Sequence, residues 1–283
     1  MRMENGLKSN FGKYAVPKAL QVLAEIDQGL QAKGGNLDEG LSFYLVHEEN
    51  FRYFNTPCDV VVFGNTGADG IHYGLLTDFG TAATLDEAPV VCVSPMSFDR
   101  PVRIVAENLE HFLSLNMNDS GLFYNHFRSE EDYARFLGEQ DDDSPYRPSE
   151  EEEERAEHIR QQVRDRLHLP QIDHPYRYVR ELQAKRDRDA WIRVRGGLHV
   201  LRPPGRYAPF SGERFHVDPE GRFETEEIFR FLDDAEPPAV MALVRDLQLH
   251  ALNGMTDLQH RLGHVLAGIG LHDEAERLRI SMD

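Results

Sequence analysis

Five short apolar runs follow one another closely between residues 41 and 106, and they constrain the fold more than any other feature. The runs are rich in β-branched or aromatic residues and are separated by Asn, Gly, Asp and Pro. They are Leu41–His47, Asp59–Phe63, Ile71–Thr77, Val90–Ser94 and Val102–Ala106. Parallel pairing would need a long crossover segment between strands, and the gaps leave no room for one. The sequence therefore predicts a mainly antiparallel sheet.

Helical patterns lie on both sides of these runs. Residues 16–32 have Pro17 in the first turn and apolar residues spaced three and four apart, and Gly34-Gly35 ends the pattern. Asn108 is expected to cap a helix after the last strand, and Ser129 with Asp132 predicts a capping box for another. The predicted class is α+β, a mainly antiparallel sheet flanked by helices.

The second half of the chain has a different pattern. Residues 239–252, 256–268 and 273–280 predict three amphipathic helices, with a capping box at Thr256 and Gln259 and a stop at Gly270. A length of 283 residues allows two domains, each with its own core. We expect a first α+β domain over residues 1–138, an acidic linker over 139–154, and a helix-rich C-terminal domain of unknown role over 155–283.

Negative charge is concentrated in the first part of the chain. Residues 1–154 contain 11 Lys and Arg against 28 Asp and Glu, whereas residues 155–283 contain 20 against 21. Such a surface repels phosphate, which argues against direct nucleic-acid binding and favours a basic partner, although solubility alone also explains it. Like charges favour a solvated spacer over 139–149, while Glu150–Glu154 suit the first turns of a helix.

The lengths of the apolar runs and the number of cysteines bear on the localisation of the protein. No run approaches the roughly 18 apolar residues of a membrane span, and residues 1–6 lack a signal-peptide core. We therefore expect a cytoplasmic protein with no membrane association. Cys58 and Cys92 cannot build a disulfide framework and lack metal-site spacing, so we expect two buried thiols and no bound metal.

The glycine-rich passage around residues 64–74 is the most distinctive candidate for chemistry. A phosphate-binding loop would continue with a Lys and a Ser or Thr, or into a helix, but a strand-like run follows here. A tight strand connection explains the glycines better. The alternative is a small-molecule or metal-dependent hydrolase, or a ligand-binding protein, that uses Asp69 and His72 with Asp78 and His47 or Asp59. In a strand, however, residues 69 and 72 would point to opposite faces unless the turn reorients one.

No other pattern indicates an enzyme. His260 and His264 lie four residues apart on a predicted helix, but they lack the Glu that completes a zinc-protease motif. A serine nucleophile elbow and a flanked cysteine nucleophile are also missing from the sequence. We therefore expect a protein that is not an enzyme and needs no cofactor.

The same passage resembles a known family. The residues that carry the resemblance are Asn55–Gly64, Thr66–Gly74, Ala88–Val91 and Ser94–Met96. They are similar to the FNTPxDVxxFGxTGxDGxHYG stretch of bacterial members of the SMI1/KNR4-like (SUKH) superfamily. The resemblance covers roughly residues 15–137. The Gly-Trp signature of many members is missing, since the only tryptophan is Trp191. The resemblance implies an α+β domain with an antiparallel sheet and flanking helices.

The resemblance also implies a function without catalytic residues. Bacterial members look like immunity proteins that bind and neutralise a cognate toxin, often a nuclease, and fungal relatives act as interaction hubs in cell-wall regulation. We therefore expect a protein-binding module with a basic toxin domain as its partner. A scaffold whose C-terminal helices dimerise or hold a partner stays open. The candidate contact residues are polar and aromatic groups of the loops: Glu48, Glu49, Arg52, Tyr53, Asp69, His72, Tyr73, Asp78, Asp86 and Glu87.

Overall fold

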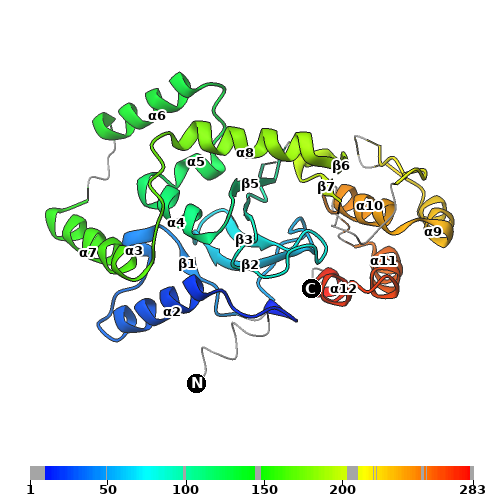
Figure 1. Ribbon diagram of the computed structural model, residues 1–283, viewed down its shortest axis with the longest axis horizontal. Helices are drawn as coiled ribbons and strands as arrows, with labels where there is room; N and C mark the ends of the chain where they lie inside the picture. Colours follow the sequence, from blue (N-terminus) through cyan, green and yellow to red (C-terminus); the bar gives the residue numbers. More distant parts are fainter. Residues whose placement is uncertain are drawn as a thin grey trace.

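A five-stranded antiparallel sheet lies at the centre of the molecule (Figure 1). The computed structural model describes residues 10–48, 50–97, 100–143, 148–202, 210–218, 220, 222–249, 252 and 254–280. The strands lie in chain order: β1 (Tyr44–Leu45), β2 (Val60–Asn65), β3 (His72–Leu76), β4 (Val90–Val93) and β5 (Val102–Ala106). Each strand falls within or overlaps one of the five predicted runs, and each neighbouring pair is antiparallel. The predicted sheet is therefore confirmed.

Both faces of this sheet are buried. On one face, Phe63 and Tyr73 belong to an apolar cluster with residues of α2 (Lys18–Gln31), α4 (Leu109–Asn118) and α5 (Gly121–Tyr124). On the other face, Val62 and Val91 belong to a second cluster that includes Leu198. An antiparallel sheet often exposes one face to water, and its strands then alternate apolar and polar residues. Burial on both faces explains why these strands are nearly continuous apolar runs instead.

The predicted caps of the N-terminal half are present. The Asn108 side chain accepts a hydrogen bond from the backbone N–H of His111 at the start of α4. Ser129 Oγ accepts one from the N–H of Asp132 at 3.1 Å, where α6 (Glu130–Asp143) begins. Each cap satisfies a backbone donor that the first helical turn leaves unpaired. Residues 139–143, which we expected in the linker, instead continue α6, and residues 144–147 lie outside the described part of the chain.

Helix α7 (Glu150–Arg166) packs against the N-terminal half. We had expected residues 150–154 to belong to a linker and residues 155–166 to belong to the C-terminal domain. The helix begins with a complete capping box between Ser149 and Glu152, which places acidic residues at the positive end of its dipole. Ile159 and Val163 of α7 are buried in the same cluster as Phe63. A Cβ at Gly40 of α3 (Asp38–Leu41) would lie 2.6 Å from the Ile159 side chain. The two helices therefore touch closely.

The described residues after 189 are mostly helical and lie beside one end of the sheet (Figure 1). Long helix α8 (Pro175–Asp189) leads into β6 (Ala190–Ile192), the short 3-10 helix η1 (Arg195–Gly197) and β7 (Val200–Leu201), and β6 and β7 form a second, antiparallel sheet. Helices α9 (Thr225–Asp234), α10 (Pro237–Leu249), α11 (Thr256–Gly268) and α12 (His272–Ile280) follow. The three predicted amphipathic helices are confirmed as α10, α11 and α12, and the α+β class with a helix-rich C-terminal part holds.

One local prediction in this half was wrong. Thr256 is the first residue of α11 and Met255 is its N-cap, with no side-chain hydrogen bond there, so the expected Thr256–Gln259 capping box does not form. A residue inside the first turn cannot take the extended conformation that a capping side chain needs. Gly270 has φ = 87°, the left-handed conformation that ends a helix, as predicted. Among the described residues, no helix is both long and apolar enough to cross a lipid bilayer.

Candidate functional site

His72 is a fully buried part of β3, and its ring is held on both sides. Its Nδ1 lies 2.7 Å from the carbonyl oxygen of Gly70, which can only accept, so Nδ1 carries the proton. Its Nε2 then accepts from Thr56 Oγ1 at 3.0 Å. Burial lowers the pKa of His72 to about 4, which keeps the ring neutral. Neither nitrogen is free for acid-base chemistry or a metal.

Asp69 does not join His72 in a site. Asp69 is exposed in the turn between β2 and β3, with φ = 52°, while His72 points into the protein. Gly67 and Gly70 also have positive φ, so the glycine-rich passage is the tight strand connection that the sequence predicts. Tyr53, 38% exposed, covers His72 with its ring, at a centroid distance of 5.5 Å. The geometry gives the hydrolase alternative no assembled site at this loop.

Asp78 was expected at a partner surface, but it lies in a buried ion-pair network. Its two carboxylate oxygens accept from Arg186 of α8, and Oδ1 also accepts from Arg245 Nη2 of α10 at 3.0 Å. Arg245 also pairs with Asp59, and all four side chains are 10% exposed or less. Burial raises the pKa of Asp78, but the two guanidinium groups outweigh that effect and lower it overall.

This network joins the sheet to the C-terminal helices. Arg245 donates to the carbonyl oxygen of His199 at 2.8 Å, and its guanidinium lies 4.8 Å from the ring of Phe79. Gln248 of α10 accepts from the N–H of Cys58 at 3.0 Å. Cys58 and Phe79 are buried among the residues of the C-terminal apolar cluster. Asp59 and Asp78, which flank the strand pair β2 and β3, thus bind the second half of the chain to the sheet.

Tyr73 and Arg52 are also structural, which corrects their placement among the contact residues. Tyr73 is fully buried among aromatic rings, and burial raises the pKa of its hydroxyl. Arg52 is half-buried and donates to the carbonyl oxygens of Val60 at 2.8 Å and Pro57 at 2.5 Å. Burial lowers the pKa of Arg52 to about 9. Tyr73 faces inward from β3, and the Arg52 guanidinium is directed at backbone carbonyl groups near the start of β2.

The remaining candidates are dispersed. Glu48, Asp86 and Glu87 are exposed, and Asp86 accepts from the backbone N–H of Lys18 at the start of α2. Glu49 lies outside the described residues. His260 and His264 are both exposed on α11. Cys58 and Cys92 are free, buried thiols, as the sequence predicts.

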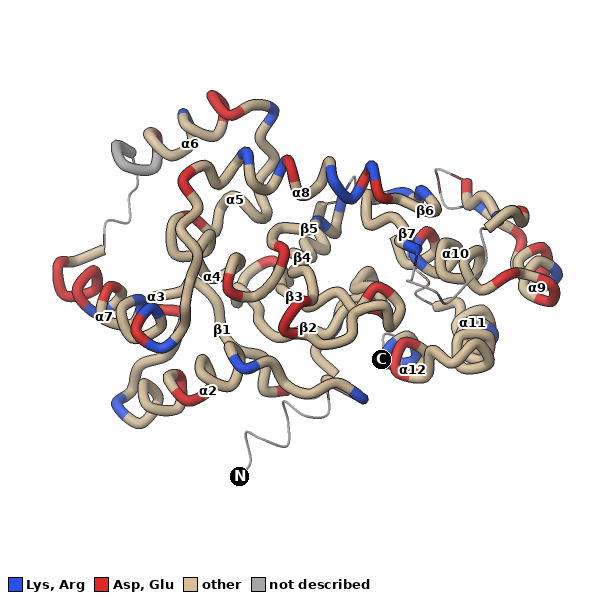
Figure 2. The backbone as a smooth tube through the Cα atoms, viewed as in Figure 1, with Lys and Arg blue, Asp and Glu red and all other residues tan. Residues whose placement is uncertain are grey.

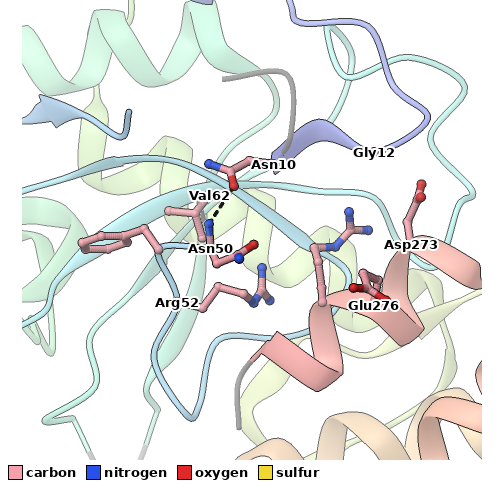
Figure 3. Close-up of a pocket in the computed structure, with 9 residues that line it drawn as sticks. Asn10, Gly12, Asn50, Arg52, Val62, Asp273 and Glu276 are labelled. Carbon is pink, nitrogen blue, oxygen red and sulfur yellow. Dashed lines mark hydrogen bonds between the residues drawn. The ribbon is translucent and has the colours of Figure 1, made fainter. Parts of the chain in front are cut away.

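A small cavity lies where the N-terminal segment, the loop before β2 and α12 meet (Figure 3). Its volume is about 70 Å³, and Arg52, Asp273 and Glu276 are among its lining residues. Asn10 Oδ1 accepts from the backbone N–H of Asn50 at 3.0 Å across one side, as the dashed line in Figure 3 shows. A space of this size admits a few water molecules and no substrate.

An acidic groove lies on the other side of the molecule, between the end of α2 and the first turns of α7. Its volume is about 1630 Å³, and its lining includes Glu39 and the exposed residues Glu151–Glu154 and Glu157. Figure 2 shows the acidic residues gathered at the start of α7. The run Glu150–Glu154 is visible in the sequence as a cluster of negative charge. Because we expected residues 139–154 to form a linker, we did not predict that this cluster packs beside α2 and α3.

The cations of this groove are largely neutralised. Arg155 pairs with Glu39 at 3.5 Å, and Arg160 pairs with Glu157 at 3.7 Å. Arg160 also donates to the carbonyl oxygen of Gly40 at 3.0 Å, which fixes α7 on α3. Glu151, Glu153 and Glu154 have no ion pair within the part of the chain that the structure describes. Their charge is therefore available to a partner.

Comparison with known proteins adds no further constraint. The chain matches no protein-family model and no curated protein sequence. Among the described residues, no group of three or more His, Cys, Asp or Glu side chains is arranged to hold a metal ion.

Proposed function

We propose that this protein is a non-catalytic binding module of the immunity type, which neutralises a basic toxin domain by binding it at the acidic groove between α2, α3 and α7. The observation that carries the proposal is the set of exposed, unpaired glutamates along that groove. The immunity role itself comes from the SUKH resemblance over the N-terminal half. A nuclease that binds nucleic acid presents cations around its active site, and a row of carboxylates competes for those cations.

The groove is built to present its charge rigidly. Helix α7 is fixed by buried Ile159 and Val163 and by its capping box, so its first turns do not have to be ordered when a partner binds. The Glu152 carboxylate is already used by the backbone N–H of Ser149 at 2.7 Å. Glu151 and Glu153 are not used in this way, and they are the residues we assign to partner contact.

The test first seeks a toxin domain in the reading frames next to this gene. It then measures association with that domain by isothermal titration calorimetry at about 50 mM and about 300 mM salt, together with inhibition of toxin activity. We expect binding that weakens as salt rises, because exposed charges are screened within about 10 Å at 0.1 M salt. Replacing both contact residues, E151Q with E153Q, is expected to weaken binding roughly two- to thirtyfold, since an exposed ion pair contributes about 0.2–1 kcal/mol.

The matched control is the pair E226Q with E227Q. These two glutamates are also exposed and also occupy the first turn of a helix, α9, far along the chain from the groove. Their replacement removes the same charge and is expected to leave affinity within about twofold, where long-range effects are screened. No association of the folded protein at low salt would overturn the proposed function. Equal losses in both double variants would overturn the assigned surface.

A further inference from the structure

A second groove, of opposite character, lies between β5 and α8 and extends to η1. Its volume is about 480 Å³. Apolar residues of the sheet and of α5, such as Ile104, Leu122 and Phe123, line it together with polar groups. Several basic side chains line this groove, although the formal net charge of the whole chain is -18. They are Arg100, Arg103, Arg180 and Arg193, with His126 beside them.

None of these four arginines forms an ion pair within the described residues. Arg103 is the most buried, and its guanidinium donates only to the backbone carbonyl oxygens of Asn125 at 2.5 Å and Tyr124 at 3.3 Å. Arg193 donates to a backbone carbonyl oxygen, that of Asp187 at 3.0 Å. Carbonyl groups orient a guanidinium but leave its charge in place. On α7, by contrast, Arg155, Arg160 and Arg164 are each paired with a carboxylate.

The one carboxylate that lines the groove is already engaged. Asp187 Oδ1 lies 3.0 Å from His199 Nε2, and His199 Nδ1 accepts from the backbone N–H of Val194 at 3.1 Å. The acceptor role of Nδ1 places the ring proton on Nε2, which therefore donates to Asp187. Asp187 thus holds His199 in position, and it does not pair with Arg180 or Arg193 across the groove. The four guanidinium groups leave an excess of positive charge there.

We propose that this groove binds a small phosphorylated ligand of about nucleotide size. Guanidinium groups match phosphate oxygens in a two-pronged geometry and stay charged at every physiological pH. A volume of about 480 Å³ is within the usual range for small-ligand sites. The half-buried rings of Phe127 and Tyr176 line the same groove and supply apolar area for the uncharged part of the ligand.

The charge of the whole molecule selects a small ligand over a nucleic-acid strand. Figure 2 shows basic residues along α8 and at β6, while acidic residues dominate the start of α7. A small ligand experiences only the cations within a Debye length, about 8 Å at physiological salt. A strand long enough to leave the groove would meet the surrounding negative field. This inference is independent of the proposed toxin binding, which uses the opposite sign of charge at another place.

The test uses isothermal titration calorimetry of the full chain at about 50 mM and about 150 mM salt with four probes: inorganic pyrophosphate, ADP, adenosine and a single-stranded oligonucleotide of about 20 nucleotides. We expect pyrophosphate and ADP to bind and adenosine not to bind. Tighter binding of ADP than of pyrophosphate would identify a nucleotide, and equal binding would identify the phosphate groups alone as the recognised part. Binding of neither anion, or tighter binding of the oligonucleotide than of ADP, would overturn the proposal.

Variants locate the site. R180Q and R193Q replace exposed groove residues, and each is expected to weaken pyrophosphate binding by up to about fivefold, because an exposed ion pair contributes about 0.2–1 kcal/mol. The double variant, R180Q with R193Q, is expected to weaken it roughly two- to thirtyfold. The control is R177Q, on the same helix, whose guanidinium pairs with Glu130 at 3.3 Å and does not line the groove. We expect R177Q to bind like the unmodified protein. An equal loss in R177Q would overturn the assignment, and circular dichroism checks that each variant is folded.

Discussion

Replacing Asp78 by Asn tests whether the buried ion-pair network holds the two halves of the chain together. The two side chains have nearly the same shape, so the change is chiefly one of charge. Asp78 accepts hydrogen bonds from both Arg186 and Arg245. After the replacement, Arg245 keeps the carboxylate of Asp59, whereas Arg186 keeps the carbonyl oxygens of Leu198 and His199. One former acceptor atom of residue 78 becomes an N–H₂ group that faces a donor.

The expected loss follows from the burial of the groups. Breaking one partner of a buried pair costs about 3–5 kcal/mol, because the remaining charge stays out of water without compensation. Arg245 and Arg186 are 2% and 3% exposed, so neither can turn to solvent. We therefore expect D78N to lower the free energy of unfolding by about 3–5 kcal/mol, a large part of the roughly 5–15 kcal/mol of an ordinary domain.

Urea unfolding at pH 7 measures this loss, with two probes. Trp191 is the only tryptophan, and it packs against the C-terminal apolar cluster, so its fluorescence reports on that half. Far-ultraviolet circular dichroism reports on all helices and strands. The control is D233N, which breaks the exposed pair between Asp233 of α9 and Arg261 of α11 and should cost no more than about 1 kcal/mol.

The outcome that contradicts this reasoning is a D78N loss as small as that of D233N. Such a result would mean that water or local rearrangement compensates the two arginines, and that the network does not join the halves. The pH dependence gives an independent check. Because Arg186 and Arg245 lower the pKa of Asp78, its stabilising contribution is present above the ordinary carboxylate pKa and is lost as pH falls through the lowered value. D78N should remove that acid-dependent part.

Three further predictions concern single sites. Burial lowers the pKa of His72 to about 4, so the stabilising contribution of the neutral ring is complete above about pH 6.5 and falls by about 1.4 kcal/mol per pH unit towards pH 4. In H72Q, the urea midpoint of unfolding should therefore fall less steeply between about pH 6.5 and about pH 4. An unchanged slope would contradict the lowered pKa. G40A should lower the unfolding free energy by about 1–3 kcal/mol by overpacking, whereas G29A, whose Cβ meets open space within α2, should raise it by about 0.5–1 kcal/mol; equal urea midpoints would refute the packing argument. Burial raises the pKa of Cys58, and that of Cys92 to about 12, so Ellman's reagent at pH 8 should label both thiols only in urea, and rapid labelling of the native protein would contradict their burial.

The sheet was predictable because its signals are local. Five apolar runs, the punctuation between them and the absence of room for crossovers are all readable within about 65 residues of sequence. The helix caps at Asn108 and Ser129 are equally local. The packing of α7 had a signal too, because Ala156, Ile159 and Val163 form an apolar stripe at helical spacing, although the surrounding charge favoured a solvated segment.

The buried ion-pair network and the groove between β5 and α8 were less predictable because their contacts are distant in sequence. Asp59 and Arg245 are 186 positions apart, and Asp78 and Arg186 are 108 apart, so no spacing rule connects them. Exposed and buried carboxylates look alike in a sequence, and Asp78 was therefore assigned to a surface. The four arginines of the basic groove come from β5 with its preceding loop, from α8 and from the segment after β6, and only the folded chain brings them together.

The buried contacts between the sheet and the C-terminal helices make each half of the chain depend on the other. A gene fragment that ends at residue 138 would encode a sheet whose Asp59 and Asp78 had lost both arginines and whose Cys58 and Phe79 had lost their apolar surroundings. We therefore do not expect this fragment to fold when it is fused to an unrelated C-terminal sequence. Recombination that exchanges one half must therefore bring matching α8 and α10 helices with it, so we expect the two halves to be inherited together.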